Sequence, residues 1–150
     1  MKRVLVCDDD ISISEVVAID LTDLKLAEVY TLPDCDNIIQ QINTIKPSVI
    51  FMDDKIPSDG GIWATQLIKN HPEYKNIPVV YFTANNDIHL LADKDGANYT
   101  LSKPFNISQL EAVVQMAFQR IQECNPTKVY LQPMADNYHN QPSINFRISF

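Results

Sequence analysis

Carboxylates that could do chemistry stand in two short groups of the chain, Asp8–Asp10 and Asp53–Asp54. Each group directly follows a short apolar run, and two later apolar runs are followed by a hydroxyl at Thr83 and an ammonium at Lys103. Two carboxylates about 4 Å apart repel by roughly 1 kcal/mol in water and by about 4 kcal/mol at an effective dielectric of about 20. A divalent cation would remove that repulsion, and ligands that are all oxygen atoms suit Mg²⁺ rather than zinc or copper.

These residue types together favour phosphoryl transfer. A carboxylate can attack phosphorus and become an acyl phosphate, while a divalent cation and a lysine neutralise charge on the phosphoryl oxygens. Three carboxylates, one Mg²⁺ and one lysine sum to zero charge before the phosphoryl group arrives. Helix capping is the simpler interpretation of an acid after a strand. Capping can account for Asp10 and Asp54. It does not explain why adjacent acids follow two apolar runs that we expect to be neighbouring strands.

For these side chains to meet, the apolar runs before them must be strands of one sheet. Five such runs alternate with helical patterns along the chain. The predicted strands are Lys2–Cys7, Ala27–Tyr30, Ser48–Met52, Val79–Phe82 and Tyr99–Leu101. Five β-α units predict an α/β domain with a parallel sheet, and ligands of such sheets bind at the carboxyl ends of the strands.

Apolar residues at helical spacing predict the helices between and after these strands. The expected helices run from about Asp10 to Leu24, from Pro33 to Ile45, around Trp63–Ile68, around Ile88–Ala92, and from Asn106 to Ile121. The last of these has the clearest start, because Asn106 and Gln109 stand at the spacing of a capping box. We expect the apolar stripes of these helices to pack against the sheet.

Length, charge and cysteine content exclude several classes of protein. The 150 residues suffice for one core. The net charge of −7 lies in residues 1–60, which hold twelve acidic and five basic residues, so we expect no nucleic-acid partner. No run reaches the about 20 apolar residues of a membrane span or the roughly 7–15 of a signal peptide, so we expect a cytoplasmic protein. Three widely spaced cysteines do not indicate a zinc site or a disulfide framework.

The sequence resembles the receiver domains of two-component response regulators, the CheY-like domains. The matching segments are VLVCDDD (4–10), KPSVIFMDDKIP (46–57), IPVVYFTA (77–84), DGA (95–97) and LSKPF (101–105). The resemblance implies a doubly wound, flavodoxin-like α/β fold with a five-stranded parallel sheet in the order 2-1-3-4-5 and five helices. It covers residues 1–123 as the receiver domain, and residues 124–150 follow as a C-terminal tail.

The resemblance also implies a role for each residue of the pocket. Asp53 would be the phosphoacceptor, Asp8, Asp9, Asp53 and the backbone carbonyl of Lys55 would hold Mg²⁺, and Thr83 and Lys103 would contact the phosphoryl oxygens. A cis peptide bond between Lys103 and Pro104 would aim the lysine. The chain would not be an enzyme beyond catalysing its own Mg²⁺-dependent phosphorylation and dephosphorylation. Its partner would be a sensor histidine kinase or a phosphotransfer protein.

Two other functions are consistent with part of this pattern. Asp8 and Asp10 form a D-x-D pair, as in phosphatases that resemble haloacid dehalogenases, where Asp8 would be the nucleophile and Asp10 the acid/base. A phosphorylation-independent docking module, a pseudo-receiver, would lack part of the pocket. The sequence also departs from the family at Thr100, where the family places an aromatic switch residue, and at Gly60, where the family has an acid.

The tail has a pattern of its own. Ile144, Phe146, Ile148 and Phe150 alternate with polar residues, which predicts a strand, and Lys128–Gln132 is a second strand candidate. The alternative is a flexible chain end. Because two lone strands are marginally stable, we expect this tail to be a binding or dimerisation arm. A homodimer could form through this arm or through the face made by the fourth helix, the fifth strand and the fifth helix.

Overall fold

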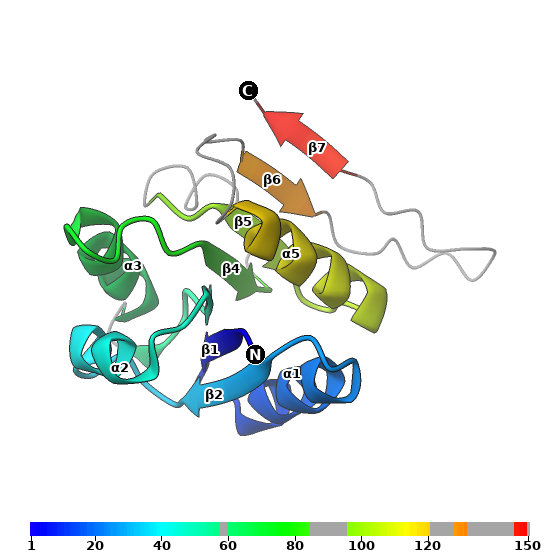
Figure 1. The fold of residues 1–150 in the computed structure, drawn as a ribbon, viewed down its shortest axis with the longest axis horizontal. Helices are drawn as coiled ribbons and strands as arrows, with labels where there is room; N and C mark the ends of the chain where they lie inside the picture. Colours follow the sequence, from blue (N-terminus) through cyan, green and yellow to red (C-terminus); the bar gives the residue numbers. More distant parts are fainter. Residues whose placement is uncertain (58–59, 85–95, 121–127, 132–145, 150) are drawn as a thin grey trace.

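The computed structural model describes residues 1–57, 60–84, 96–120, 128–131 and 146–149. The strands are β1 (Arg3–Cys7), β2 (Glu28–Leu32), β3 (Val49–Met52), β4 (Val79–Thr83), β5 (Tyr99–Ser102), β6 (Lys128–Leu131) and β7 (Phe146–Ser149). The helices are α1 (Ile11–Asp23), α2 (Ile38–Ile45), α3 (Gly60–Asn70) and α5 (Ile107–Arg120). In these residues strands and helices alternate from β1 to β4, and β5, α5, β6 and β7 follow (Figure 1). The short helix expected around Ile88–Ala92 lies outside the described residues.

One sheet runs through the molecule in the order β2-β1-β3-β4-β5-β6-β7. The first five strands pair in parallel, which confirms the predicted doubly wound fold and the order 2-1-3-4-5. The sheet then continues into the tail, because β6 pairs in parallel with β5 and β7 pairs antiparallel with β6. Both tail strands therefore lie where the sequence pattern predicts them, and β6 joins them to β5 of the same chain.

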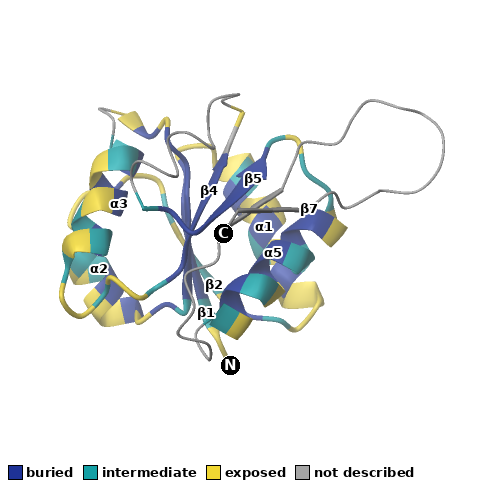
Figure 2. Ribbon diagram, turned by 90° about the horizontal axis from the view of Figure 1, so that it is seen from above, coloured by how far each residue is buried: buried dark blue, intermediate teal, exposed yellow. Residues whose placement is uncertain are grey.

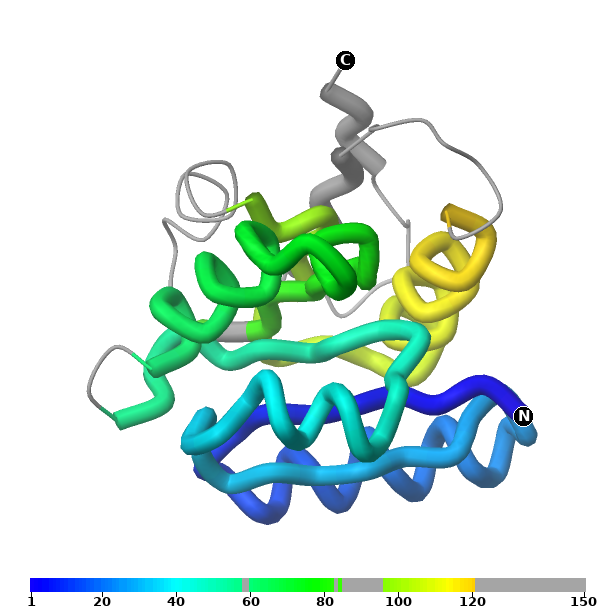
Figure 3. Tube along the Cα trace, turned by 60° about the vertical axis from the view of Figure 1, so that its left-hand side comes forward, coloured from blue at the N-terminus to red at the C-terminus, as the bar shows by residue number. Residues whose placement is uncertain are grey.

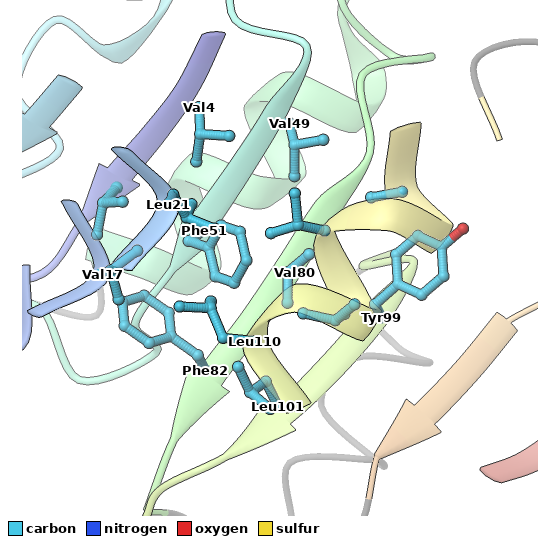
Figure 4. Packing of buried hydrophobic residues seen from close by; sticks show 14 of the residues in the cluster. Val4, Val17, Leu21, Val49, Phe51, Val80, Phe82, Tyr99, Leu101 and Leu110 are labelled. Atoms are coloured by element: carbon cyan, nitrogen blue, oxygen red, sulfur yellow. The ribbon is translucent and has the colours of Figure 1, made fainter. Parts of the chain in front are cut away.

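Helices cover both faces of this sheet, with α1 and α5 on one side and α2 and α3 on the other (Figure 2). On the α1–α5 face, Val17 of α1 and Leu110 of α5 pack against Phe51 and Phe82 of the central strands (Figure 4). The rings of Phe51 and Phe82 meet edge to face, with centroids 5.6 Å apart. The other face holds a second buried cluster, which includes Ile42 of α2. Burial on both faces is why β3 is continuously apolar and why β1 after Arg3 and β4 before Thr83 are apolar as well.

Local capping explains where two of the helices begin. The Asp10 carboxylate accepts hydrogen bonds from the backbone N–H groups of Ser12 at 3.0 Å and Ile13 at 3.4 Å, so Asp10 is the N-cap of α1. At α5, Asn106 Oδ1 accepts from the Gln109 N–H at 2.8 Å, and Gln109 Oε1 accepts from the Asn106 N–H at 3.0 Å. The predicted capping box is therefore confirmed.

Two expectations about helices are wrong. The second helix begins at Ile38 rather than at Pro33, because the Asp34 carboxylate accepts the Asp36 N–H at 2.9 Å and Asn37 has a positive φ of 55°. These contacts make a turn that competes with helix. Trp63 was expected on the packed face of its helix, but it is 55% exposed. None of the helices in the described ranges is long and apolar enough to cross a membrane.

Candidate functional site

The ends of β1 and β3 bring two acids together at one edge of the sheet. Cys7 and Met52 are partners in the parallel register of these strands, so Asp8 and Asp53 leave the sheet side by side. The Asp53 backbone N–H donates to the Cys7 carbonyl oxygen at 3.0 Å, which continues the ladder one residue beyond the strands. Parallel strands thus place both carboxylates where open α/β sheets bind ligands.

Three carboxylates gather at this edge. One oxygen from each of Asp8, Asp9 and Asp53 lies within 4.8 Å of the others. Asp8 is 2% exposed and Asp53 is 6% exposed, whereas Asp9 is open to solvent. The third acid of the first group, Asp10, is turned to α1 as its cap and is not part of the cluster. The cluster therefore offers oxygen ligands only, with one side open to solvent.

Lys103 supplies the positive charge of the site. It follows β5, and its Nζ lies 2.8 Å from Asp8 Oδ2 and 3.7 Å from Asp53 Oδ2. The same ammonium lies over the Phe82 ring, 4.7 Å from its centroid. The Lys103–Pro104 peptide bond is cis, as predicted. One lysine thus faces two buried carboxylates, and the described groups of the pocket carry net negative charge.

The environment of Asp53 raises the pKa of its carboxyl to about 6, from an ordinary value of 3.8. Burial is the main cause, since it disfavours the charged form. The Lys103 charge and the hydrogen bond from the Lys55 backbone N–H, at 3.2 Å to Asp53 Oδ1, oppose the rise in pKa. The neighbouring Asp8 carboxylate adds to it. Any cation bound at this cluster would favour the ionised form.

Gly61 is a site residue to which the sequence pattern assigns no role. It lies in the first turn of α3 and packs directly on the Asp53–Asp54 peptide. A Cβ added at Gly61 would overlap the Asp53 carbonyl oxygen and would lie 2.9 Å from the Asp53 carbonyl carbon. Gly60 has no such constraint, because its added Cβ would have an ordinary contact of 3.5 Å with Ile56. The Gly-Gly pair was the available signal, but it does not show which glycine is needed.

Two residues with roles implied by the resemblance are placed only in part. Thr83 ends β4 and pairs with Ser102 of β5, so its backbone reaches the same edge of the sheet, while its side chain is outside what the structure describes. Lys55 has an exposed side chain and follows Asp53 in the turn after β3. Cation binding by the Lys55 carbonyl stays a prediction.

The position of the family's switch aromatic holds a buried Thr100. Its partner in the β4–β5 register is Tyr81, which is also fully buried. The adjacent Tyr99 belongs to the opposite face, where its hydroxyl donates to the Met116 carbonyl of α5 at 3.2 Å. Tyr99 therefore does not substitute for a ring at position 100, as strand alternation predicts.

Comparisons with known proteins agree with this geometry. The response regulator receiver domain profile matches residues 4–115. The chain is 35% identical over 106 residues to the CAI-1 autoinducer sensor kinase/phosphatase CqsS of Vibrio cholerae, which covers 69% of this chain and 15% of that protein. It is 29% identical over 122 residues to the phosphate regulon transcriptional regulatory protein PhoB of Klebsiella pneumoniae, covering 80% and 53%. The chain thus spans about half or less of the length of these relatives.

Solved structures are similar in the same region. The chemotaxis protein CheY4 of Vibrio cholerae superimposes with a TM-score of 0.71 and 28% sequence identity. The superposition covers 78% of this chain and 98% of that one. The shared part is therefore the α/β domain.

Proposed function

Because this chain belongs to the response regulator receiver domain family, it is a signalling module of two-component systems, and we propose that Asp53 is its phosphoacceptor. The observation that supports this most is the position of Asp53. It directly follows β3 at the sheet edge, within 4.8 Å of the other two acids of the cluster and 3.7 Å from Lys103. Residues 1–123 would be the receiver domain and residues 124–150 an added arm.

The proposed reaction is an in-line transfer from a phosphohistidine of a sensor kinase or phosphotransfer protein. An ionised Asp53 oxygen attacks phosphorus, the new P–O bond forms, and the P–N bond breaks with the electron pair returning to the histidine nitrogen. Because the pKa of Asp53 is about 6, the carboxylate is mostly ionised at neutral pH. Lys103 is close enough to balance charge on the phosphoryl oxygens while it contacts Asp8. Thr83 would hold a further oxygen.

The carboxylate cluster fits Mg²⁺. Asp8, Asp9 and Asp53 present only oxygen atoms, and the exposed Asp9 leaves one side open for the waters that Mg²⁺ retains. The backbone carbonyl of Lys55 would complete the protein ligands. When bound, the ion neutralises phosphoryl charge and lowers the cost of ionising Asp53. The protein's own contribution is to hold the two buried carboxylates and Lys103 in place beforehand.

The phosphatase alternative is not favoured. It would need Asp8 as nucleophile and Asp10 as acid/base. Asp8 is engaged on both oxygens, since Oδ1 accepts the Asp10 N–H at 2.9 Å and Oδ2 accepts from Lys103 at 2.8 Å. The Asp10 carboxylate is engaged as the cap of α1. A pseudo-receiver is not favoured either, because the acidic cluster and its lysine are present together.

Intact mass measurement of the full chain tests the assignment. We expect wild type to gain one phosphoryl group from acetyl phosphate with MgCl₂ and to gain none with EDTA. Asp53→Asn should gain none under either condition. The control Asp10→Asn, which removes a charge beside the pocket and can still cap α1, should react like wild type. Full phosphorylation of Asp53→Asn would refute the assignment. If Asp8→Asn lost the phosphoryl mass gain while Asp53→Asn kept it, the phosphatase would be favoured.

A further inference from the structure

A groove lies between α2 and α3. These two helices run side by side on one face of the sheet (Figure 3). The groove has a volume of about 540 Å³ and is lined by Ile39 of α2 and by Trp63 and Leu67 of α3. At one end the Tyr74 hydroxyl donates to Asn43 Oδ1 at 3.0 Å, which fixes the wall formed by these two residues.

Trp63 stands on the rim of this groove. The residues that α3 buries are Gly61, Ala64, Thr65 and Ile68, and this stripe leaves position 63 facing away from the sheet. The indole is 55% exposed and is the only tryptophan of the chain. Large exposed aromatic side chains beside an apolar groove are typical of interfaces. The same patch thus carries both a projecting ring and a groove of a size to receive one.

The groove also lacks charged side chains among its lining residues, and α2 contains no charged residue. The lysine of α3, Lys69, donates to the Ile77 carbonyl at 2.7 Å and to Asn98 Oδ1 at 2.7 Å, toward β5. By contrast, the exposed Ile19 of α1 has the exposed acids Glu15 and Asp23 on the same helix.

We propose that the α2–α3 groove is the surface through which two copies of this chain pair. Trp63 of each copy would insert into the groove of the other. A two-fold dimer needs a patch that is complementary to itself, and this patch supplies both the ring and the groove. Each copy carries a net charge of −7, so two copies repel, and the repulsion is smallest where no acidic side chain lines the contact. No charged residue lines the groove, whereas the acids Glu15 and Asp23 are exposed near Ile19 on α1.

The charge argument also predicts how salt acts on the dimer. The interface itself has no charged lining residue, so added salt breaks no ion pair there. Salt does screen the repulsion between the two acidic copies. We therefore expect a weak dimer that becomes tighter as NaCl is raised from low to moderate concentration. An interface built on ion pairs would respond in the opposite direction.

Sedimentation equilibrium and tryptophan fluorescence on the full chain test the proposal together. We expect wild type to dimerise with concentration, and its emission to shift to shorter wavelength with the same midpoint, because Trp63 is the only indole. Trp63→Ala should raise the dimer dissociation constant at least about tenfold. The matched control is Ile19→Ala, which removes a side chain that is 58% exposed on α1 and should leave the constant unchanged.

Gln40→Glu provides a second variant that keeps the tryptophan. Gln40 is exposed and lines the groove, so this near-isosteric change puts one carboxylate in each copy of the interface. We expect it to weaken the dimer without changing the circular dichroism of the monomer. A protein that stays monomeric up to about 1 mM would overturn the proposal. So would a dimer that forms without the emission shift, or one that Trp63→Ala and Gln40→Glu leave unchanged, since either would place the interface elsewhere.

Discussion

Asp53 must be ionised in a place that disfavours its charge. Burial at the end of β3 raises its pKa to about 6, and the single ammonium of Lys103 is shared with Asp8. A proposed nucleophile held in this way is strained before any donor arrives. The strain is electrostatic, so it depends on pH and can be removed by changing one atom of the side chain.

We expect Asp53→Asn to stabilise the metal-free protein at pH 7–8 by up to about 3 kcal/mol. The folded pKa is about 6 and the ordinary value is 3.8, so between these values the folded state keeps a proton that the unfolded state has released. The stability of wild type should therefore decline as pH rises through this window. Well above pH 6, wild type has lost all of the stability that depends on the Asp53 proton. The variant has no carboxyl group at this position, so it loses none.

Urea unfolding in EDTA from pH 3.5 to pH 8 measures this difference. Other acids titrate in the same range, but they are common to both proteins and cancel in the comparison. The advantage of the variant should vanish near pH 4 and reach its maximum above pH 7. Parallel stability curves for wild type and Asp53→Asn across the whole range would contradict the raised pKa.

Gly61 is a second residue on which the site depends, because its lack of a side chain leaves room for the Asp53 peptide. We expect Gly61→Ala to destabilise the protein by about 1–3 kcal/mol and to slow phosphorylation, because the new Cβ must displace the Asp53 peptide. Gly60→Ala is the matched control, since its Cβ would have room in the same helix turn. That change should be neutral or stabilising by up to about 1 kcal/mol. Equal effects of the two substitutions on stability and phosphorylation would refute this role of Gly61.

At the scale of elements, sequence patterns succeeded where the cause is local. The apolar runs before Asp8 and Asp53 are strands, and the capping residues Asp10 and Asn106 stand where their spacing predicts. The sequence patterns failed where contacts with neighbouring residues determine the structure. Pro33 does not begin a helix because of side-chain contacts in the turn after it, and Trp63 is exposed because the sheet contacts a stripe one position away. Periodicity alone does not distinguish two adjacent apolar stripes.

The β4–β5 pair leads to a prediction about its buried ring. Thr100 and Tyr81 are register partners and both are fully buried, so a second ring has no room. We expect Thr100→Tyr alone to destabilise the protein by about 1–3 kcal/mol. The exchanged double variant, Tyr81→Thr with Thr100→Tyr, keeps the total side-chain volume and should recover part of that loss. Thermal unfolding of the three variants and wild type tests the coupling, and strictly additive effects would contradict it.

At the scale of the whole molecule, the parallel sheet is what assembles the site. Asp8, Asp53 and Lys103 are far apart in sequence and meet because β1, β3 and β5 end at the same edge. That convergence follows from the strand order, so the residues of the cluster could be predicted from the sequence. The close approach of Gly61 and the raised pKa of Asp53 could not, because both depend on how neighbouring segments pack.

The same convergence concentrates negative charge, and it predicts that Mg²⁺ stabilises the fold. A ligand that binds only the folded state raises its stability by mass action, by about 2.7 kcal/mol at a hundred times its dissociation constant. We therefore expect the melting temperature of wild type to rise with millimolar MgCl₂ relative to EDTA at matched ionic strength. Asp9→Asn is the informative variant, because it removes one carboxylate of the cluster without removing either carboxylate that Lys103 contacts, Asp8 or Asp53. Its metal-free melting temperature should be close to that of wild type, while its response to MgCl₂ should be largely lost. A wild-type melting temperature that does not change with MgCl₂ would show that the carboxylates do not form a Mg²⁺ site.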